Sequence, residues 1–181
     1  MRQTLLTLAT LAIAVSAVAQ GTVNFTTRSG TSVNAPVTYP WGGLVSGTGN
    51  AAVLGQLYAA ALGATLVAVG NPVPFRSDVG AGYITAGGTV EIPGTTVAGT
   101  GQVKLVAWFA NLGASYVEAL EKNRGGYGES AVLTVHGLGG GTTPPALLVG
   151  LQGFSFSVIP EPSIAALGLL GAGLLLICRK K

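Results

Sequence analysis

The sequence contains very few of the side chains on which most metal sites and many enzymes depend. It has one cysteine, Cys178, one histidine, His136, and one aspartate, Asp78. A single cysteine excludes an intramolecular disulfide, so apolar packing alone must stabilise the fold. A zinc site would lack the second histidine or the cysteines that usually complete its ligand set. We therefore predict a protein without a metal centre.

Catalytic motifs are equally scarce. A serine triad would need both His136 and Asp78, and the chain has no G-x-S-x-G nucleophile elbow. Residues 47–52 match the glycine spacing of a dinucleotide fingerprint but lack its strand-turn-helix context, so we interpret them as a turn. The dispersed carboxylates match no EF-hand loop, although a calcium site that uses backbone carbonyls stays open. We predict that the protein is not an enzyme and uses no cofactor.

Charged residues make up only 8% of the chain, and their distribution matters more than their number. The formal net charge of +3 comes from the two ends, because residues 20–159 hold five cations and five anions. A neutral domain without a basic cluster has little with which to neutralise phosphates. This balance argues against nucleic-acid binding.

The first 19 residues have the three parts of a secretory signal peptide. Arg2 supplies a positive charge, residues 5–15 form an apolar stretch, and residues 17–19 read Ala-Val-Ala, an A-x-A cleavage site. The apolar stretch is too short to span a bilayer. We predict that signal peptidase cleaves this segment and that the mature chain begins at Gln20.

The last 22 residues, 160–181, carry a second targeting pattern. Prolines hold a Pro-Glu-Pro triplet extended, and the apolar run after it would rise about 22 Å as a helix, against a hydrocarbon core of about 30 Å. Cations at the end could reach the headgroups and keep the C-terminus cytoplasmic. The segment comprises a triplet of Pro160, Glu161 and Pro162, a transmembrane anchor with Ile164, Leu167, Leu169, Leu170, Leu174, Leu175, Leu176 and Ile177, and a basic stop of Arg179, Lys180 and Lys181.

This arrangement resembles the PEP-CTERM sorting domain of Gram-negative bacterial surface proteins. The resemblance implies that Pro160, Glu161 and Pro162 are recognised by an exosortase, a membrane-embedded processing enzyme. The protein would be held transiently in the inner membrane and then released to the cell surface or extracellular matrix. A permanent single-span anchor is the alternative. Short matches at residues 21–25, 56–58 and 151–154 resemble small PEP-CTERM proteins of Verrucomicrobia-type bacteria, a family that implies no activity.

Residues 20–159 predict one all-β domain. Glycine accounts for 26 of these 140 residues, against a usual share of about 7%, which favours turns over helices. Short strands between turns are typical of a single antiparallel β-sandwich, here jelly-roll-like. The strands are expected at residues 22–26, 53–59, 83–85, 89–92, 102–110, 130–136 and 153–158. One short helix is expected at residues 115–123, with Ser115 as N-cap and Glu118 paired with Lys122, and a flexible loop at residues 139–145.

Aromatic residues are the best candidates for ligand contacts in this domain. The predicted strand at 102–110 has an apolar run that ends in Trp108 and Phe109, which indicates a central strand buried on both faces, and Trp108 is expected in the core. Trp41 and Tyr127 lie in glycine-rich turns and are expected to be exposed. We predict a cell-surface or matrix protein with a structural or adhesive role and no catalysis. A module that binds exopolysaccharide is the alternative, and a secreted hydrolase is a weaker one.

Overall fold

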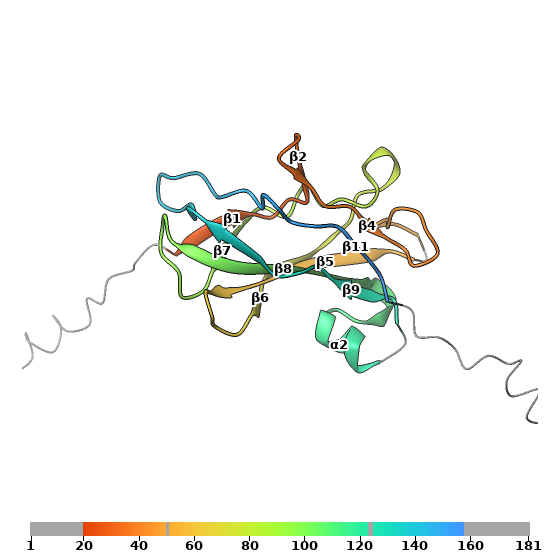
Figure 1. Cartoon of the computed structure of the whole chain (residues 1–181). Coiled ribbons are helices and arrows are strands. Elements are labelled where there is room, and N and C mark those ends of the chain that lie inside the picture. Colours follow the sequence, from red (N-terminus) through yellow and green to blue (C-terminus); the bar gives the residue numbers. More distant parts are fainter. Residues whose placement is uncertain (1–19, 50, 123–124, 158–181) are drawn as a thin grey trace, which may run out of the picture.

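A five-stranded antiparallel sheet forms the centre of the protein (Figure 1). The computed structural model describes residues 20–49, 51–122 and 125–157. The two longest strands, β5 (Val53–Ala61) and β8 (Thr100–Phe109), pair along their whole length. On its other side β8 pairs with β10 (Leu133–His136) and β9 (Tyr127–Glu129), and β5 pairs with the edge strand β6 (Val67–Pro74).

Three short strand pairs lie over one face of this sheet (Figure 1). The antiparallel pairs are β1 (Gly21–Asn24) with β7 (Thr89–Ile92), and β2 (Arg28–Ser29) with β3 (Val33–Asn34). The third pair, β4 (Val37–Thr38) with β11 (Phe154–Ser155), is parallel. This parallel pair departs from the purely antiparallel prediction, because parallel strands need a long connection and cannot be inferred from a hairpin signal.

Alternation of side chains along β8 separates two apolar clusters. Val103, Leu105 and Ala107 face the short strand pairs, where they join Val23 and Phe25 in the main core. The opposite face of β8 carries a smaller cluster that lies against α2. This smaller cluster contains Val106, Trp108, Leu112, Tyr116 and Ala119. The prediction that this strand is central and buried on both faces is confirmed.

The helix α2 (Tyr116–Glu121) begins where the sequence predicts. The Ser115 hydroxyl accepts a hydrogen bond from the Glu118 backbone N–H at 3.3 Å, which makes Ser115 the N-cap. The predicted ion pair of Glu118 with Lys122 is wrong for the described residues. The Glu118 carboxylate instead turns back to the helix start, where it accepts hydrogen bonds from Ala114 N and Ser115 Oγ at 3.0 and 3.2 Å.

An all-β fold with one short α-helix is confirmed, and most of the long strands lie where the sequence places them. Residues 83–85 form no strand, and the strand expected at 153–158 is shortened to β11. The largest omission is β6, whose sequence includes Gly70, Pro72 and Pro74. Proline is tolerated there because an edge strand does not need every N–H for pairing.

Residues 139–145, expected as a flexible loop, form a hydrogen-bonded turn. Gly140 and Thr143 exchange two backbone hydrogen bonds, both of 2.9 Å. Gly139 exchanges two more with Thr22 of β1, at 3.0 and 2.9 Å. These bonds attach the turn to the first strand of the domain.

The predicted signal peptide, residues 1–19, and the predicted sorting segment, residues 160–181, lie outside the described residues. Within the described part of the chain, no helix is long and apolar enough to cross a membrane; α2 has six residues and rises only about 9 Å. This finding overturns the predicted localisation, which relied on a C-terminal helical anchor in the inner membrane before transfer to the cell surface or matrix. Cleavage by signal peptidase and recognition by exosortase stay predictions.

Candidate functional site

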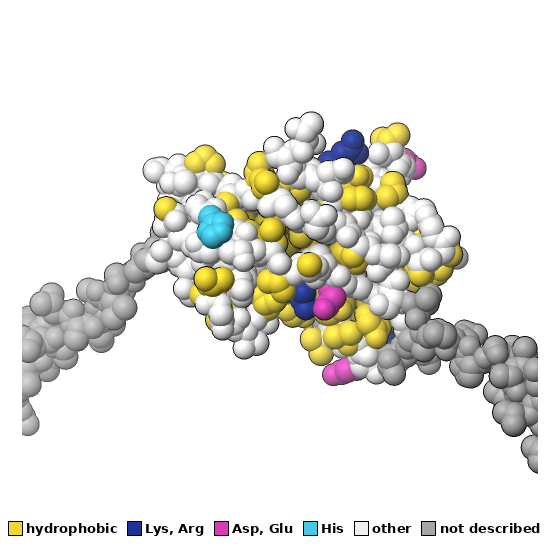
Figure 2. Space-filling model, in the orientation of Figure 1, with side chains coloured by type: hydrophobic (Ala, Val, Ile, Leu, Met, Phe, Trp, Pro, Cys, Tyr) yellow, Lys and Arg dark blue, Asp and Glu magenta, His cyan; other side chains and the backbone are white. Residues whose placement is uncertain are grey.

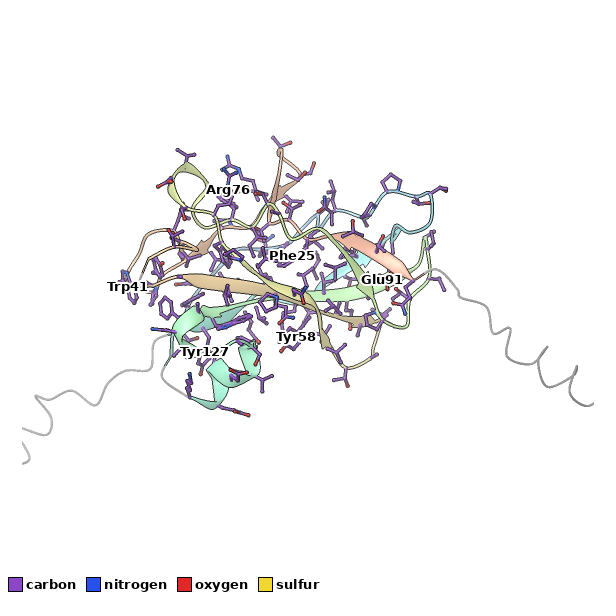
Figure 3. The ribbon with its side chains drawn as sticks, turned by 180° about the vertical axis from the view of Figure 1, so that it is seen from behind. Phe25, Trp41, Tyr58, Arg76, Glu91 and Tyr127 are labelled. Atoms are coloured by element: carbon purple, nitrogen blue, oxygen red, sulfur yellow. The ribbon has the colours of Figure 1, made fainter. Side chains whose placement is uncertain are left out.

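A cavity of about 370 Å³ opens between α2, β9 and the end of β11. Its volume lies within the usual range for small-ligand sites, about 300–1,000 Å³. Tyr127, one of its walls, lies beside α2 in Figure 3. The lining consists of Tyr116, Leu120, Tyr127, Gly128, Glu129, Ser155 and Ser157. Three separate segments of the chain therefore supply aromatic, acidic and hydroxyl groups to one cavity.

The aromatic wall is held by contacts centred on Tyr116. Its ring makes edge contacts with Tyr58 and Tyr127, at centroid distances of 6.0 and 6.1 Å and interplanar angles of 73° and 84°. Trp108 lies beneath, with its ring centroid 6.0 Å from that of Tyr116. The Trp108 indole N–H donates to the Gly113 carbonyl at 3.0 Å, which fixes the base of the cluster. Such edge contacts are the arrangement that aromatic rings favour, so the Tyr127 ring is well supported.

Glu129 is the acidic group of the cavity. Its Oε2 accepts a hydrogen bond from Lys104 Nζ at 2.7 Å and a longer one from the Tyr116 hydroxyl at 3.4 Å. The Glu129 side chain is 50% exposed and that of Lys104 is 21% exposed, so the pair borders on solvent. Among the described residues Oε1 has no hydrogen-bond partner, which leaves it able to accept from a ligand.

The surface around these groups carries little charge. Figure 2 shows charged side chains as few and scattered on the face that it presents, among hydrophobic and uncharged polar ones. Long-range electrostatic attraction of a charged ligand depends on clusters of charges of one sign on the protein surface. The scattered charges favour a ligand recognised by shape and short-range contacts.

We expect the stability of the protein to fall as the pH rises above about 10, because of Tyr116. Burial raises the pKa of this hydroxyl well above its usual value near 10.0, and the Glu129 carboxylate raises it further. Below that pH both folded and unfolded chains keep the proton. At higher pH the unfolded chain releases it first, so the stability contributed by the neutral tyrosine is progressively lost.

Urea unfolding of the wild type and of Tyr116→Phe between about pH 8 and 11 measures this contribution. The stability difference between the two proteins should shrink or reverse as the pH rises. Tyr83→Phe, which removes a hydroxyl bound to Asn34, serves as the control. A difference between wild type and Tyr116→Phe that stays constant over this range would contradict the expectation.

Trp41 lies outside the cavity, in the turn that follows β4. Its side chain is 70% exposed, as expected from the sequence, and its ring stacks on that of Tyr39 at 5.1 Å and 7°. Tyr127, expected to be exposed in a turn, is instead half-buried because it lies in β9 and lines the cavity. Contact of either residue with a ligand stays a prediction.

The two residues that a triad would need are not joined. His136 lies in β10, with Nδ1 3.1 Å from the Thr100 hydroxyl. Asp78 begins the short 3-10 helix η1 (Asp78–Gly80), which follows β6. In the described part of the chain no hydrogen bond links them, and no group of three metal-ligating side chains forms.

Sequence reasoning missed Glu129 and the two serines of the cavity. The signal for Glu129 is its spacing of two from Tyr127 in a strand, which places both side chains on one face. No local signal identifies Ser155 and Ser157, because both reach the cavity through partners distant in sequence: Ser157 pairs with Tyr127 in an isolated antiparallel bridge, and Ser155 belongs to β11, which pairs with β4.

No protein-family model, no curated protein and no solved structure matches this chain. The fold and the cavity therefore define only a broad class, an all-β domain with an aromatic-lined cavity of ligand size.

Proposed function

We propose that the protein is a non-catalytic adhesive domain that binds carbohydrate in the cavity of Tyr116, Tyr127 and Glu129. The observation that carries this proposal is the combination of tyrosine rings, one carboxylate and two serines around about 370 Å³. A sugar ring has apolar C–H faces that can lie on an aromatic ring, and hydroxyls that donate to carboxylate and serine oxygens. A neutral sugar thus matches both kinds of group.

The carboxylate inventory favours binding over hydrolysis. Most glycosidases need two carboxyl groups about 5–10 Å apart, one on each side of the scissile bond. Glu129 is the one carboxylate among the described residues that line the cavity, and it is bound to Lys104. The remaining alternative is a purely structural role without a ligand, which does not account for the cavity.

We also propose that the two layers form a β-sandwich. The apolar cluster between the five-stranded sheet and the short pairs supports this arrangement, since sandwiches bury the facing sides of two sheets. The parallel pair of β4 and β11 argues against a regular jelly roll. Processing by an exosortase at Pro160, Glu161 and Pro162 is a separate proposal that rests on the sequence resemblance.

Tyr127→Ala should weaken polysaccharide binding about tenfold. The change removes both ring stacking and apolar contact area, and a loss of about 1.4 kcal/mol corresponds to a factor of ten. The measurement is affinity electrophoresis or calorimetry of the purified protein with a panel of neutral and acidic polysaccharides. Tyr83→Ala removes another half-buried tyrosine, one that lies outside the cavity, and should bind as the wild type does. An equal loss of affinity in the two variants, or no binding by the wild type to any polysaccharide of the panel, would contradict the proposal.

A further inference from the structure

Trp41 is unusual because it is both exposed and rigidly supported. Its ring lies nearly parallel to that of Tyr39, with centroids 5.1 Å apart, while 70% of the side chain remains exposed. Tyr39 is itself fixed, since its hydroxyl donates to the Ala51 carbonyl and accepts from the Ser46 N–H, each at 3.2 Å. A flat apolar surface is thus already in place before any ligand arrives, which lowers the ordering cost of binding.

The backbone of the turn also holds Trp41 outward. Tyr39 N–H donates to the Gly43 carbonyl at 2.9 Å, and Gly42 N–H donates back to the Tyr39 carbonyl at 3.0 Å. Both glycines have positive φ, 93° and 84°, which other residues adopt only with strain. The turn is therefore a defined structure, and the tryptophan at its tip has a defined position.

Aromatic contacts connect this turn to the strand that carries Tyr127. The Tyr39 ring stacks on Phe109 at 6.0 Å. The Phe109 N–H donates to the carbonyl of Gly126 at 2.9 Å, and Gly126 directly precedes Tyr127. In Figure 3 the labelled residues Trp41 and Tyr127 lie toward the same end of the molecule. The exposed tryptophan and the cavity thus form two supported aromatic surfaces at one end of the protein.

We propose that Trp41 is a second carbohydrate contact and that the ligand is a polysaccharide chain long enough to touch both Trp41 and the Tyr127 cavity. This inference rests on the proposed function. A polymer of sugar rings repeats the same flat apolar face along its length, so one chain can use two separated aromatic surfaces. Residues 20–159 are neutral overall, which suits a chain held by stacking and hydrogen bonds more than by ion pairing.

The second contact should act through effective concentration. Once the cavity holds one part of a chain, another part meets Trp41 as an intramolecular event, and affinity rises without any change at the cavity. A saccharide too short to reach both surfaces gains nothing from Trp41. Chain length therefore separates the two contacts experimentally.

The test compares a polysaccharide that the wild type binds with a disaccharide from the same polymer. Trp41→Ala should weaken polymer binding about tenfold or more and leave disaccharide affinity unchanged. Tyr127→Ala should weaken both. Leu62→Ala, which truncates an exposed apolar residue just beyond the far end of β5, should change neither. Trp41→Tyr, which keeps an aromatic face, should recover part of the polymer affinity.

The outcomes distinguish this inference from the proposed function. Unchanged polymer binding by Trp41→Ala, together with loss in Tyr127→Ala, overturns the second contact and leaves the cavity proposal standing. Equal weakening of polymer and disaccharide by Trp41→Ala overturns the division into two contacts. A wild type that binds no polysaccharide overturns both proposals. Urea unfolding of each variant identifies any loss that comes from misfolding.

Discussion

Replacing Trp108 with alanine is expected to lower the free energy of unfolding by about 3–5 kcal/mol. The Trp108 side chain is fully buried, in the cluster between the central sheet and α2. Its removal would leave a cavity beneath Tyr116 and an unpaired Gly113 carbonyl that now accepts the indole N–H at 3.0 Å. Urea unfolding followed by circular dichroism measures the change without relying on tryptophan fluorescence.

Trp41→Ala makes the same chemical change on the surface and is the matched control. Because Trp41 is 70% exposed and its contact with Tyr39 is one aromatic stack, its loss should cost about 1 kcal/mol or less. Similar unfolding free energies for the two variants would contradict the assignment of Trp108 to a packed core. Trp108→Ala should also weaken carbohydrate binding, because it removes the indole ring that packs against Tyr116 of the cavity.

The central parts of the fold could be predicted because their signals are local. The apolar run that ends in Trp108 predicts a strand buried on both faces, and β8 has that position. Ser115 followed by Glu118 predicts the start of a helix, and Ser115 caps α2. In each case the residues that carry the signal also make the stabilising contact.

Other elements depend on partners that are distant in sequence. The prolines of β6 read as breaks, and only the position of this strand at the edge of the sheet makes them acceptable. The cavity joins α2 and β9 to residues 155 and 157, and the Ser157 N–H donates to the Tyr127 carbonyl of β9 at 2.9 Å. No spacing within any one of these segments indicates that they meet.

The glycine residues show what composition can predict and what it cannot. Its abundance predicts turns, and Gly42 and Gly43 do form one with positive φ. Gly139 is required for a different reason, because a side chain on it would overlap the backbone of Pro144 and Pro145. Composition cannot separate a glycine needed for backbone conformation from one needed for close approach.

Gly139→Ala is therefore expected to lower the free energy of unfolding by about 3 kcal/mol, near the upper end of the usual cost of overpacking. A methyl group at this buried position would lie only 2.5 and 2.6 Å from the Pro145 Cα and the Pro144 carbonyl carbon. The backbone of Gly139 cannot easily move away, because its two hydrogen bonds with Thr22, of 3.0 and 2.9 Å, attach it to β1. Two stiff prolines on the opposite side leave little room for adjustment.

Gly101→Ala is the control, since it adds the same methyl group in a strand of the central sheet. There the nearest atoms are side-chain carbons of Ile92 at 3.1 Å, a contact that a displacement of a few tenths of an ångström relieves. The added contact and the lower entropy of the unfolded chain should nearly cancel, so stability should change by less than about 1 kcal/mol. Amide hydrogen exchange should show faster exchange at Thr22 and Gly140 in Gly139→Ala and wild-type rates in Gly101→Ala. Wild-type stability and exchange in Gly139→Ala would mean that the turn at residues 139–145 yields easily, against the close packing seen here.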